Sequence, residues 1–304
     1  YPYWLDHANL DRAGANFTLN AHYLGALEDF SQLLKWLEED ETNIFRERAN
    51  LLRGSMREYF WNENEGLFAD ALLESGLSDK YSEHSNGMAL ALKIASADQG
   101  KSIVKKLLAD EPNLFIKRST GMTIVTPALS YFLHQGIAYY GHVDASFDLL
   151  RKRFDHMLAS QHNGTLWEEW WLDGTGRSGK FDSRQTRSDA QTESAFIPAL
   201  FAEFLLGVKP TKPGMTEMII KLPQTKIKKI NSVIPSPMGE VSVKWNRTLS
   251  KNKSLQLDIP KGMEIKLDIE SFKIPQGRSI RINGKKIPMA SFYKIPSGKW
   301  EVVF

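Results

Sequence analysis

Residues 207–214 read Gly-Val-Lys-Pro-Thr-Lys-Pro-Gly, and this stretch decides how the 304-residue chain divides. A glycine that can end a helix is followed by two prolines, which cannot continue one. The balance of charge also changes sign here, because residues 209–304 hold 19 Lys and Arg against 7 Asp and Glu, whereas residues 1–208 hold 20 against 29. A composition break of this size indicates a domain boundary. We expect one domain over residues 1–208 and a second over residues 209–304.

The first domain is predicted to be mainly α-helical. Apolar residues recur every three or four positions from Leu19 to Leu37, behind Asn16 or Thr18 as candidate helix caps. About seven helices joined by short connections favour antiparallel helical hairpins. The further predicted helices cover residues 44–61, 85–97, 100–109, 127–141, 145–158 and 191–206, and the longer loops are 62–81, 111–124 and 161–189.

The second domain is predicted to be an antiparallel β-sandwich. Apolar and polar residues alternate over 241–245, 255–259 and 265–269, and residues 280–282 lead into Asn283-Gly284, a strong hairpin signal. Several short strands at this spacing are typical of a sandwich. The lysines of this domain are spread through every strand and turn without an aromatic stacking motif, so we do not expect nucleic acid as a partner.

Composition and missing motifs exclude several classes of protein. The chain has no cysteine, which excludes disulfide scaffolds, thiolate zinc sites, iron–sulfur clusters and a cysteine nucleophile. No apolar run approaches the length of a membrane-spanning helix. The sequence contains no HExxH pair, no GxSxG elbow, no GxGxxG after a strand and no calcium-loop pattern. We therefore predict no metal and no cofactor.

Residues 163–171, Asn-Gly-Thr-Leu-Trp-Glu-Glu-Trp-Trp, are the strongest candidate for chemistry. Sugars present apolar C–H faces and a rim of hydroxyls, which suit aromatic platforms beside carboxylates, and cleavage of a glycosidic bond needs a pair of carboxyl groups. The plainer interpretation stays open: the tryptophans plug the domain and the acids face solvent. Other acids and histidines could equally be helix caps or hydrogen-bonded structure, namely Asp6, Asp11, Glu83, Asp189, Glu193, His7, His22, His84 and His134.

The order of helices, acidic and aromatic loop, and sandwich resembles the C-terminal part of glycoside hydrolase family 78, the α-L-rhamnosidases. The resemblance covers nearly the whole chain. Within the motif at Thr165-Leu166-Trp167-Glu168, the glutamate corresponds to the family's general base. The other similar segments are residues 4–14, 18–27, 126–129, 239–245 and 255–262.

This resemblance implies a fold and an activity. The expected fold is an (α/α)6 toroid, incomplete in this chain, followed by the β-sandwich. The expected activity is hydrolysis of terminal α-L-rhamnosides with inversion, so the partner is a rhamnose-containing glycan or glycoside and Glu168 is the general base. The candidate substrate-binding residues are Trp4, Asp6, Trp167, Trp170, Asp189 and Glu193.

Two features depart from the family pattern. No motif matches the family's general acid, and a closed toroid needs more helical hairpins than the sequence predicts. Because the chain also starts at Tyr1, we expect that an N-terminal portion of the same protein is missing. The alternative is that a second polypeptide supplies the remaining helices. In addition, residues 187–193 carry Asp189 where the family typically has a histidine. No charged-then-apolar stretch follows Tyr1 in the given sequence, and the resemblance suggests a periplasmic or extracellular bacterial location.

Two other functions remain as alternatives. A polysaccharide lyase could use the same helical scaffold, because fold does not settle function. A non-catalytic carbohydrate-binding protein could use the tryptophans of residues 163–171 as a platform.

Overall fold

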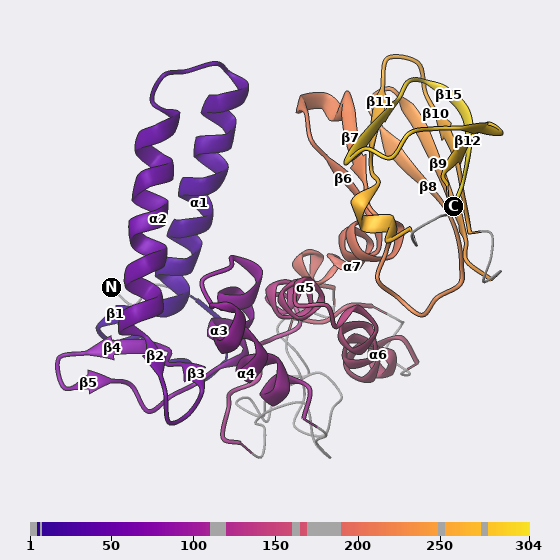
Figure 1. Ribbon diagram of the computed structural model, residues 1–304. Helices are drawn as coiled ribbons and strands as arrows, with labels where there is room; N and C mark the ends of the chain where they lie inside the picture. The colour runs from indigo at the N-terminus through magenta and orange to yellow at the C-terminus, as the bar shows by residue number, and fades with distance from the viewer. Residues whose placement is uncertain are drawn as a thin grey trace. The chain divides into compact units, whose positions relative to one another are not determined.

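The computed structural model describes residues 5–6, 8–109, 120–159, 165–168, 190–248, 253–274 and 279–304 (Figure 1). Internal contacts divide the chain into two compact units, Tyr1–Ile197 and Pro198–Phe304. This division lies upstream of the glycine and proline stretch at 207–214. The helical turns at residues 201–206 belong to the second unit, because they contact its strands. The domain limits 1–208 and 209–304 stay a prediction.

Within the described residues the chain forms seven α-helices, and their bounds refine the prediction. The range 191–206 is not one continuous helix, because it is split into 3₁₀, α and π turns, and the helix expected over 85–97 ends at Ala91. The α-helices are α1 (Phe17–Trp36), α2 (Thr42–Tyr59), α3 (Glu83–Ala91), α4 (Ala97–Leu107), α5 (Tyr131–Tyr139), α6 (Val143–Ala159) and α7 (Ile197–Leu200), with the 3₁₀-helix η1 (Thr192–Ser194) and the π-helix η2 (Phe201–Leu206) beside α7.

Side-chain caps explain where three of these helices begin. The Asn16 side chain accepts a hydrogen bond from the Leu19 amide at 3.0 Å, which confirms Asn16 as the cap of α1. Ser82 caps α3 in the same way. Ser96 and Gln99 form a reciprocal capping box at the start of α4, so two amides that have no helical partner are satisfied there.

The first unit also contains short strands that the sequence analysis assigned to a loop. The prediction of a loop over 62–81 was wrong, because β3, β4, β5 and the second residue of β2 lie in this range and belong to two small antiparallel sheets, in the orders β1-β4-β5 and β2-β3. Their strands are only two or three residues long, too short to show an alternating pattern. The strands are β1 (Ala15–Asn16), β2 (Trp61–Asn62), β3 (Leu67–Phe68), β4 (Ala71–Leu73) and β5 (Gly76–Leu77).

Helix α3 lies at the centre of the first unit, since all nine of its residues are buried. Glycines allow α3 and α5 to approach closely. A Cβ added at Gly87 would lie 2.8 Å from the Leu133 Cα, and one added at Gly136 would lie 2.6 Å from the Leu90 Cβ. Both distances are shorter than real contacts, so this crossing requires glycine at both positions.

Helix α1 buries a different face from the one its apolar pattern suggests. It lies beside α2 (Figure 1) and buries Ala21, Leu24, Leu27 and Leu34. A second apolar stripe stays exposed, with relative exposures from 43% at Phe30 to 61% at Leu37. We call this set the α1 stripe: Leu19, Tyr23, Phe30, Leu33 and Leu37. Contiguous apolar surface of this kind is typical of an interface.

The second unit is built from two sheets around one core. The six-stranded sheet has the order β13-β12-β15-β10-β9-β8, and the four-stranded sheet has the order β14-β11-β7-β6. The strands are β6 (Val208–Pro210), β7 (Glu217–Ile220), β8 (Lys229–Ser236), β9 (Gly239–Asn246), β10 (Ser254–Ile259), β11 (Glu264–Asp268), β12 (Arg281–Ile282), β13 (Lys285–Lys286), β14 (Phe292–Ile295) and β15 (Gly298–Val303), with 3₁₀ turns η3 (Pro213–Met215) and η4 (Glu270–Phe272).

Two details test the prediction for this unit. Asn283 and Gly284 both have positive φ, 45° and 79°, so they form the expected tight turn between β12 and β13. The expectation of a wholly antiparallel sandwich was wrong, because β11 pairs with β7 in parallel. That pair is possible because the long connection between the two strands passes through the other sheet.

Aromatic side chains fill the core of the second unit. Trp245 is buried against Phe272 and Phe304, with ring centroids 5.7 Å and 6.3 Å away. Its indole N–H donates to the Leu206 carbonyl oxygen at 2.8 Å. Through this bond, the residues before the glycine and proline stretch are anchored to the strands. In neither unit does any described helix have the length and hydropathy needed to cross a bilayer.

We expect Gly136→Ala to destabilise the protein by roughly 1–3 kcal/mol, because the added methyl group overpacks the crossing of α3 and α5. The matched control is Gly54→Ala in α2, where an added Cβ would meet nothing within 4 Å. That change should stabilise the protein by roughly 0.5–1 kcal/mol through helix propensity. Urea unfolding of both variants measures the difference, and equal effects would contradict the close approach.

Candidate active site

The described part of the candidate motif is a short segment held by backbone interactions. The Leu166 carbonyl oxygen accepts a hydrogen bond from the Gln191 amide at 2.8 Å, and the Trp167 carbonyl oxygen accepts one from the Ser194 hydroxyl at 2.8 Å. Trp167 is buried, whereas the Glu168 side chain is half-buried. The motif therefore presents a carboxylate from a segment whose backbone is fixed by residues more than twenty positions away.

The segment that donates these two hydrogen bonds also carries a second acid. Glu193 lies in η1, between Gln191 and Ser194, so it belongs to the segment that holds Leu166 and Trp167. Its carboxylate is exposed and accepts a hydrogen bond from the Thr192 hydroxyl at 3.1 Å. Three other predicted site residues, Trp4, Trp170 and Asp189, lie outside the described residues.

Asp6 occupies a buried polar cluster. Its Oδ1 accepts a hydrogen bond from the Thr126 hydroxyl at 2.7 Å, and its Oδ2 accepts one from the Thr126 amide at 3.3 Å. The same carboxylate lies 3.8 Å from Nδ1 of His84. Two segments singled out in the sequence, residues 4–14 and 126–129, are thus joined by their polar side chains. Sequence spacing gave no signal for this pairing, because the partners are 120 positions apart.

A second buried cluster contains an ion pair. Arg153 of α6 donates two hydrogen bonds to Glu83 of α3, at 2.7 Å and 2.8 Å, and both side chains are fully buried. The Val125 amide also donates to this carboxylate at 3.2 Å. The sequence analysis listed Glu83 only among ambiguous acids, and it did not find Arg153. Because both side chains are fully buried, each charge depends strongly on the presence of the other.

Two buried histidines have lowered pKa values, His134 near the Glu83–Arg153 pair and His84 near Asp6. Burial and, to a lesser extent, the nearby Arg153 charge lower the pKa of His134 to about 3. Burial likewise lowers the pKa of His84 to about 4, although Asp6 acts in the opposite direction. Neither ring nitrogen of His84 has a hydrogen-bond partner among the described residues. Both rings are therefore uncharged at neutral pH. His7 lies outside the described residues.

Asp70 is a buried carboxyl group whose pKa is raised instead of lowered. Its Oδ1 accepts hydrogen bonds from the Ser82 and Ser85 hydroxyls, both at 2.6 Å. Burial nevertheless raises the pKa of Asp70 from its ordinary value of 3.8 to about 6, because desolvation outweighs the two hydrogen bonds. The sequence analysis did not single out Asp70, since it lies in the range assigned to a loop.

The chemistry available here is that of carboxylates. A half-buried glutamate on a fixed segment can accept a proton from water, which is the role of a general base. Among the described residues, no group of three or more His, Asp or Glu side chains is arranged to hold a metal ion.

Two families match parts of the chain. The family described as the bacterial alpha-L-rhamnosidase C-terminal domain matches residues 207–279, and the family described as trehalase matches residues 15–127. A search of curated proteins finds no match.

Several solved structures share the fold. The GH78 family rhamnosidase of Bacillus sp. GL1 is 24% identical with a TM-score of 0.71, over 87% of this chain and 27% of that chain. The α-L-rhamnosidase of Dictyoglumus thermophilum is 15% identical with a TM-score of 0.66, over 93% of this chain and 31% of that chain. The Streptomyces avermitilis α-L-rhamnosidase, solved with L-rhamnose, is 15% identical with a TM-score of 0.61, over 94% of this chain and 26% of that chain.

The chain therefore resembles the family 78 α-L-rhamnosidases in fold, as the sequence motifs predicted. It spans between about a quarter and a third of the length of the structures it matches.

The buried carboxyl Asp70 makes stability depend on pH. The folded state holds its proton more tightly than the unfolded chain does, so the stability it contributes is complete below about pH 4 and is lost as the pH rises through about 6. The Asp70→Asn variant has no carboxyl group to titrate at this position, so it does not lose stability in this way as the pH rises. We expect the free energy of unfolding of Asp70→Asn, relative to wild type, to increase by up to roughly 3 kcal/mol between about pH 4 and about pH 7.

His84→Gln provides a control of opposite sign, measured by the same urea unfolding. The folded pKa of His84 is lowered, so its contribution is complete above about pH 6.5 and is lost as the pH falls through about 4. The relative stability of His84→Gln should therefore rise as the pH falls. If both variants changed in the same direction with pH, the assignment of these two buried groups would be wrong.

Proposed function

We propose that this chain is the C-terminal part of a glycoside hydrolase that cleaves terminal α-L-rhamnosides, with Glu168 as the general base. The observation that carries the proposal is the fixed segment at residues 165–168, which matches the Thr-x-Trp-Glu motif within a rhamnosidase-like fold. A general base must lie on a precisely held backbone, because catalysis depends on its position within ångströms.

In this mechanism the half-buried Glu168 carboxylate takes a proton from water as that water attacks the anomeric carbon. The bond from this carbon to the leaving oxygen breaks, and a carboxylic acid protonates the leaving oxygen. An inverting site separates the two carboxyl groups by about 6.5–9.5 Å, leaving room for the water. The acid is expected in the part of the protein that precedes this chain. Trp4, Asp6, Trp167, Trp170, Asp189 and Glu193 stay candidates for substrate binding.

The α1 stripe supports the view that more of the protein packs against this chain. Its five apolar side chains are all more than 40% exposed. A helix that exposes a stripe of this length normally lies against another helix. We propose that an N-terminal portion of the longer protein supplies that helix and completes the toroid.

The direct test is Glu168→Gln in the longer protein that contains this chain, assayed on an aryl α-L-rhamnoside. Loss of the base should lower kcat by roughly 10²–10⁴-fold without changing the far-ultraviolet circular dichroism. The matched control is Glu240→Gln, an exposed glutamate of β9, which should keep the wild-type rate.

A Glu168→Gln variant with a rate near that of wild type would refute the assignment of the base. A wild-type protein that forms an unsaturated product absorbing near 235 nm would identify a lyase instead.

A further inference from the structure

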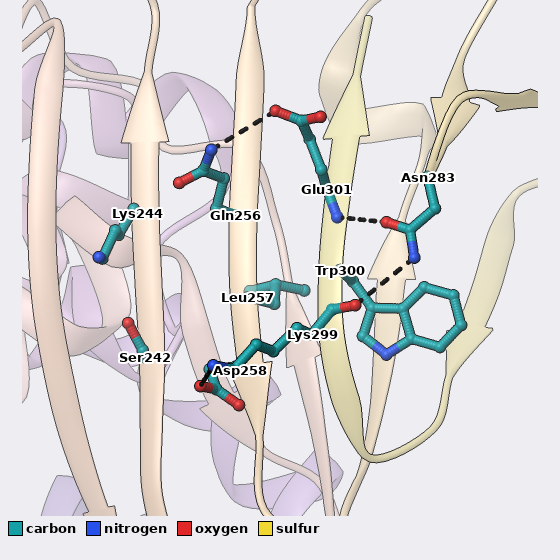
Figure 2. Close-up of a pocket in the computed structure, with 9 residues that line it drawn as sticks. All are labelled: Ser242, Lys244, Gln256, Leu257, Asp258, Asn283, Lys299, Trp300 and Glu301. Atoms are coloured by element: carbon teal, nitrogen blue, oxygen red, sulfur yellow. Dashed lines mark hydrogen bonds and ion pairs between the residues drawn. The ribbon is translucent and has the colours of Figure 1, made fainter.

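The outer face of the six-stranded sheet carries a polar groove that is lined only by residues of the second unit. Its cavity volume is about 410 Å³, which lies within the range of small-molecule sites. Figure 2 shows its side chains on β9, β10 and β15, with Asn283 of the β12–β13 turn at one edge. The lining consists of Ser242, Lys244, Gln256, Leu257, Asp258, Asn283, Lys299, Trp300 and Glu301.

Strand register places these side chains in two rows across the sheet. Ser242, Asp258 and Lys299 are direct neighbours in one row, and Lys244, Gln256 and Glu301 are direct neighbours in the next. Because residues two apart on a strand share a face, both rows point to the same side. The rows belong to regular strands, so the strand register sets the backbone positions of these polar residues.

The groups in the groove already restrain one another (Figure 2). Lys299 lies 3.7 Å from the Asp258 carboxylate, and the Gln256 amide donates to Glu301 at 3.4 Å. The Asn283 side chain accepts a hydrogen bond from the Glu301 amide at 2.8 Å. These contacts are long or exposed, since Lys299 and Asp258 are 85% and 53% exposed. They orient the side chains but leave donor and acceptor capacity open to a ligand.

The charge of the groove differs from that of its surroundings. Residues 209–304 carry 19 Lys and Arg against 7 Asp and Glu, yet the groove holds two lysines and two acids. A site for a polyanion would concentrate cations, and a site for a hydrophobic partner would not be lined mainly by polar side chains. A balanced set of donors and acceptors suits a neutral ligand that offers both, such as a chain of sugar hydroxyls.

Trp300 of β15 belongs to the other face of the sheet. It pairs with the buried Leu257, packs partly against the core of the second unit, and its indole N–H donates to the Pro296 carbonyl oxygen at 2.9 Å. The surface that the groove offers to a ligand is therefore formed by the two polar rows.

From this geometry we propose that the groove is a binding site for a neutral oligosaccharide, separate from the candidate active site. Hydroxyls of the sugar chain exchange hydrogen bonds with both rows, formed by Ser242, Asp258 and Lys299 and by Lys244, Gln256 and Glu301. The site performs no chemistry. The proposal does not depend on Glu168, because the groove lies entirely within the second unit.

The test is calorimetric titration of this 304-residue chain with neutral hexasaccharides of xylan, cellulose and arabinan, and with a heparin hexasaccharide as a polyanion. We expect at least one neutral sugar to bind and heparin to bind more weakly. Gln256→Ala combined with Glu301→Ala removes a cross-strand polar pair from the groove and should weaken binding at least tenfold, about 1.4 kcal/mol.

The matched control removes a polar pair from the other sheet. Glu264→Ala combined with Lys294→Ala breaks an exposed ion pair of 2.8 Å outside the groove and should leave the affinity within twofold of wild type. Glu168→Gln should also leave this binding unchanged, which separates the groove from the active site. The proposal is overturned if no neutral hexasaccharide binds, if heparin is preferred, or if the Gln256 and Glu301 double variant binds like wild type.

Discussion

The buried ion pair between Glu83 and Arg153 is the interaction on which the first unit depends. Both side chains are fully buried, so each charge has exchanged water for its partner. Removing one member of such a pair typically costs about 3–5 kcal/mol, because the other charge stays buried alone. The pair joins α3 to α6, and the Val125 amide adds the chain segment before α5. Three distant parts of the sequence are thereby fixed around one carboxylate.

Helix α3 extends this constraint to the rest of the unit. Ser82 and Ser85 hydrogen-bond Asp70, Asn86 bonds the backbone of Phe68, and Gly87 allows α5 to pack directly on the helix. The helix is too short to be stable alone. Its stability comes from these surroundings, so it forms only when the strands and the other helices are in place.

Local sequence patterns predicted the helices and strands better than they predicted which residues contact one another. Alternation over 241–245 and 255–259 predicted strands β9 and β10, and the Asn283-Gly284 turn formed as expected. Periodicity also predicted α1, but half of its apolar positions are exposed, since periodicity does not say which apolar face has a partner in the chain.

The candidate site was predictable only as a motif. Residues 165–168 were visible as an unusual run of acids and tryptophans, but their anchoring by Gln191 and Ser194 was not. The contact of Asp6 with Thr126 and the pairing of Glu83 with Arg153 also join residues far apart in sequence. Such contacts follow from the three-dimensional path of the chain and leave no spacing signal. Part of the site stays a prediction, since Trp4, Trp170 and Asp189 lie outside the described residues.

We propose that a carboxylate of this chain directs water to an anomeric carbon with inversion. Proton NMR of the first sugar released from an aryl α-L-rhamnoside by the longer protein, recorded before the anomers equilibrate, tests this proposal. We expect β-L-rhamnose to appear first and the α-anomer to follow by mutarotation. Initial release of α-L-rhamnose would show retention and would contradict Glu168 as a base acting on water.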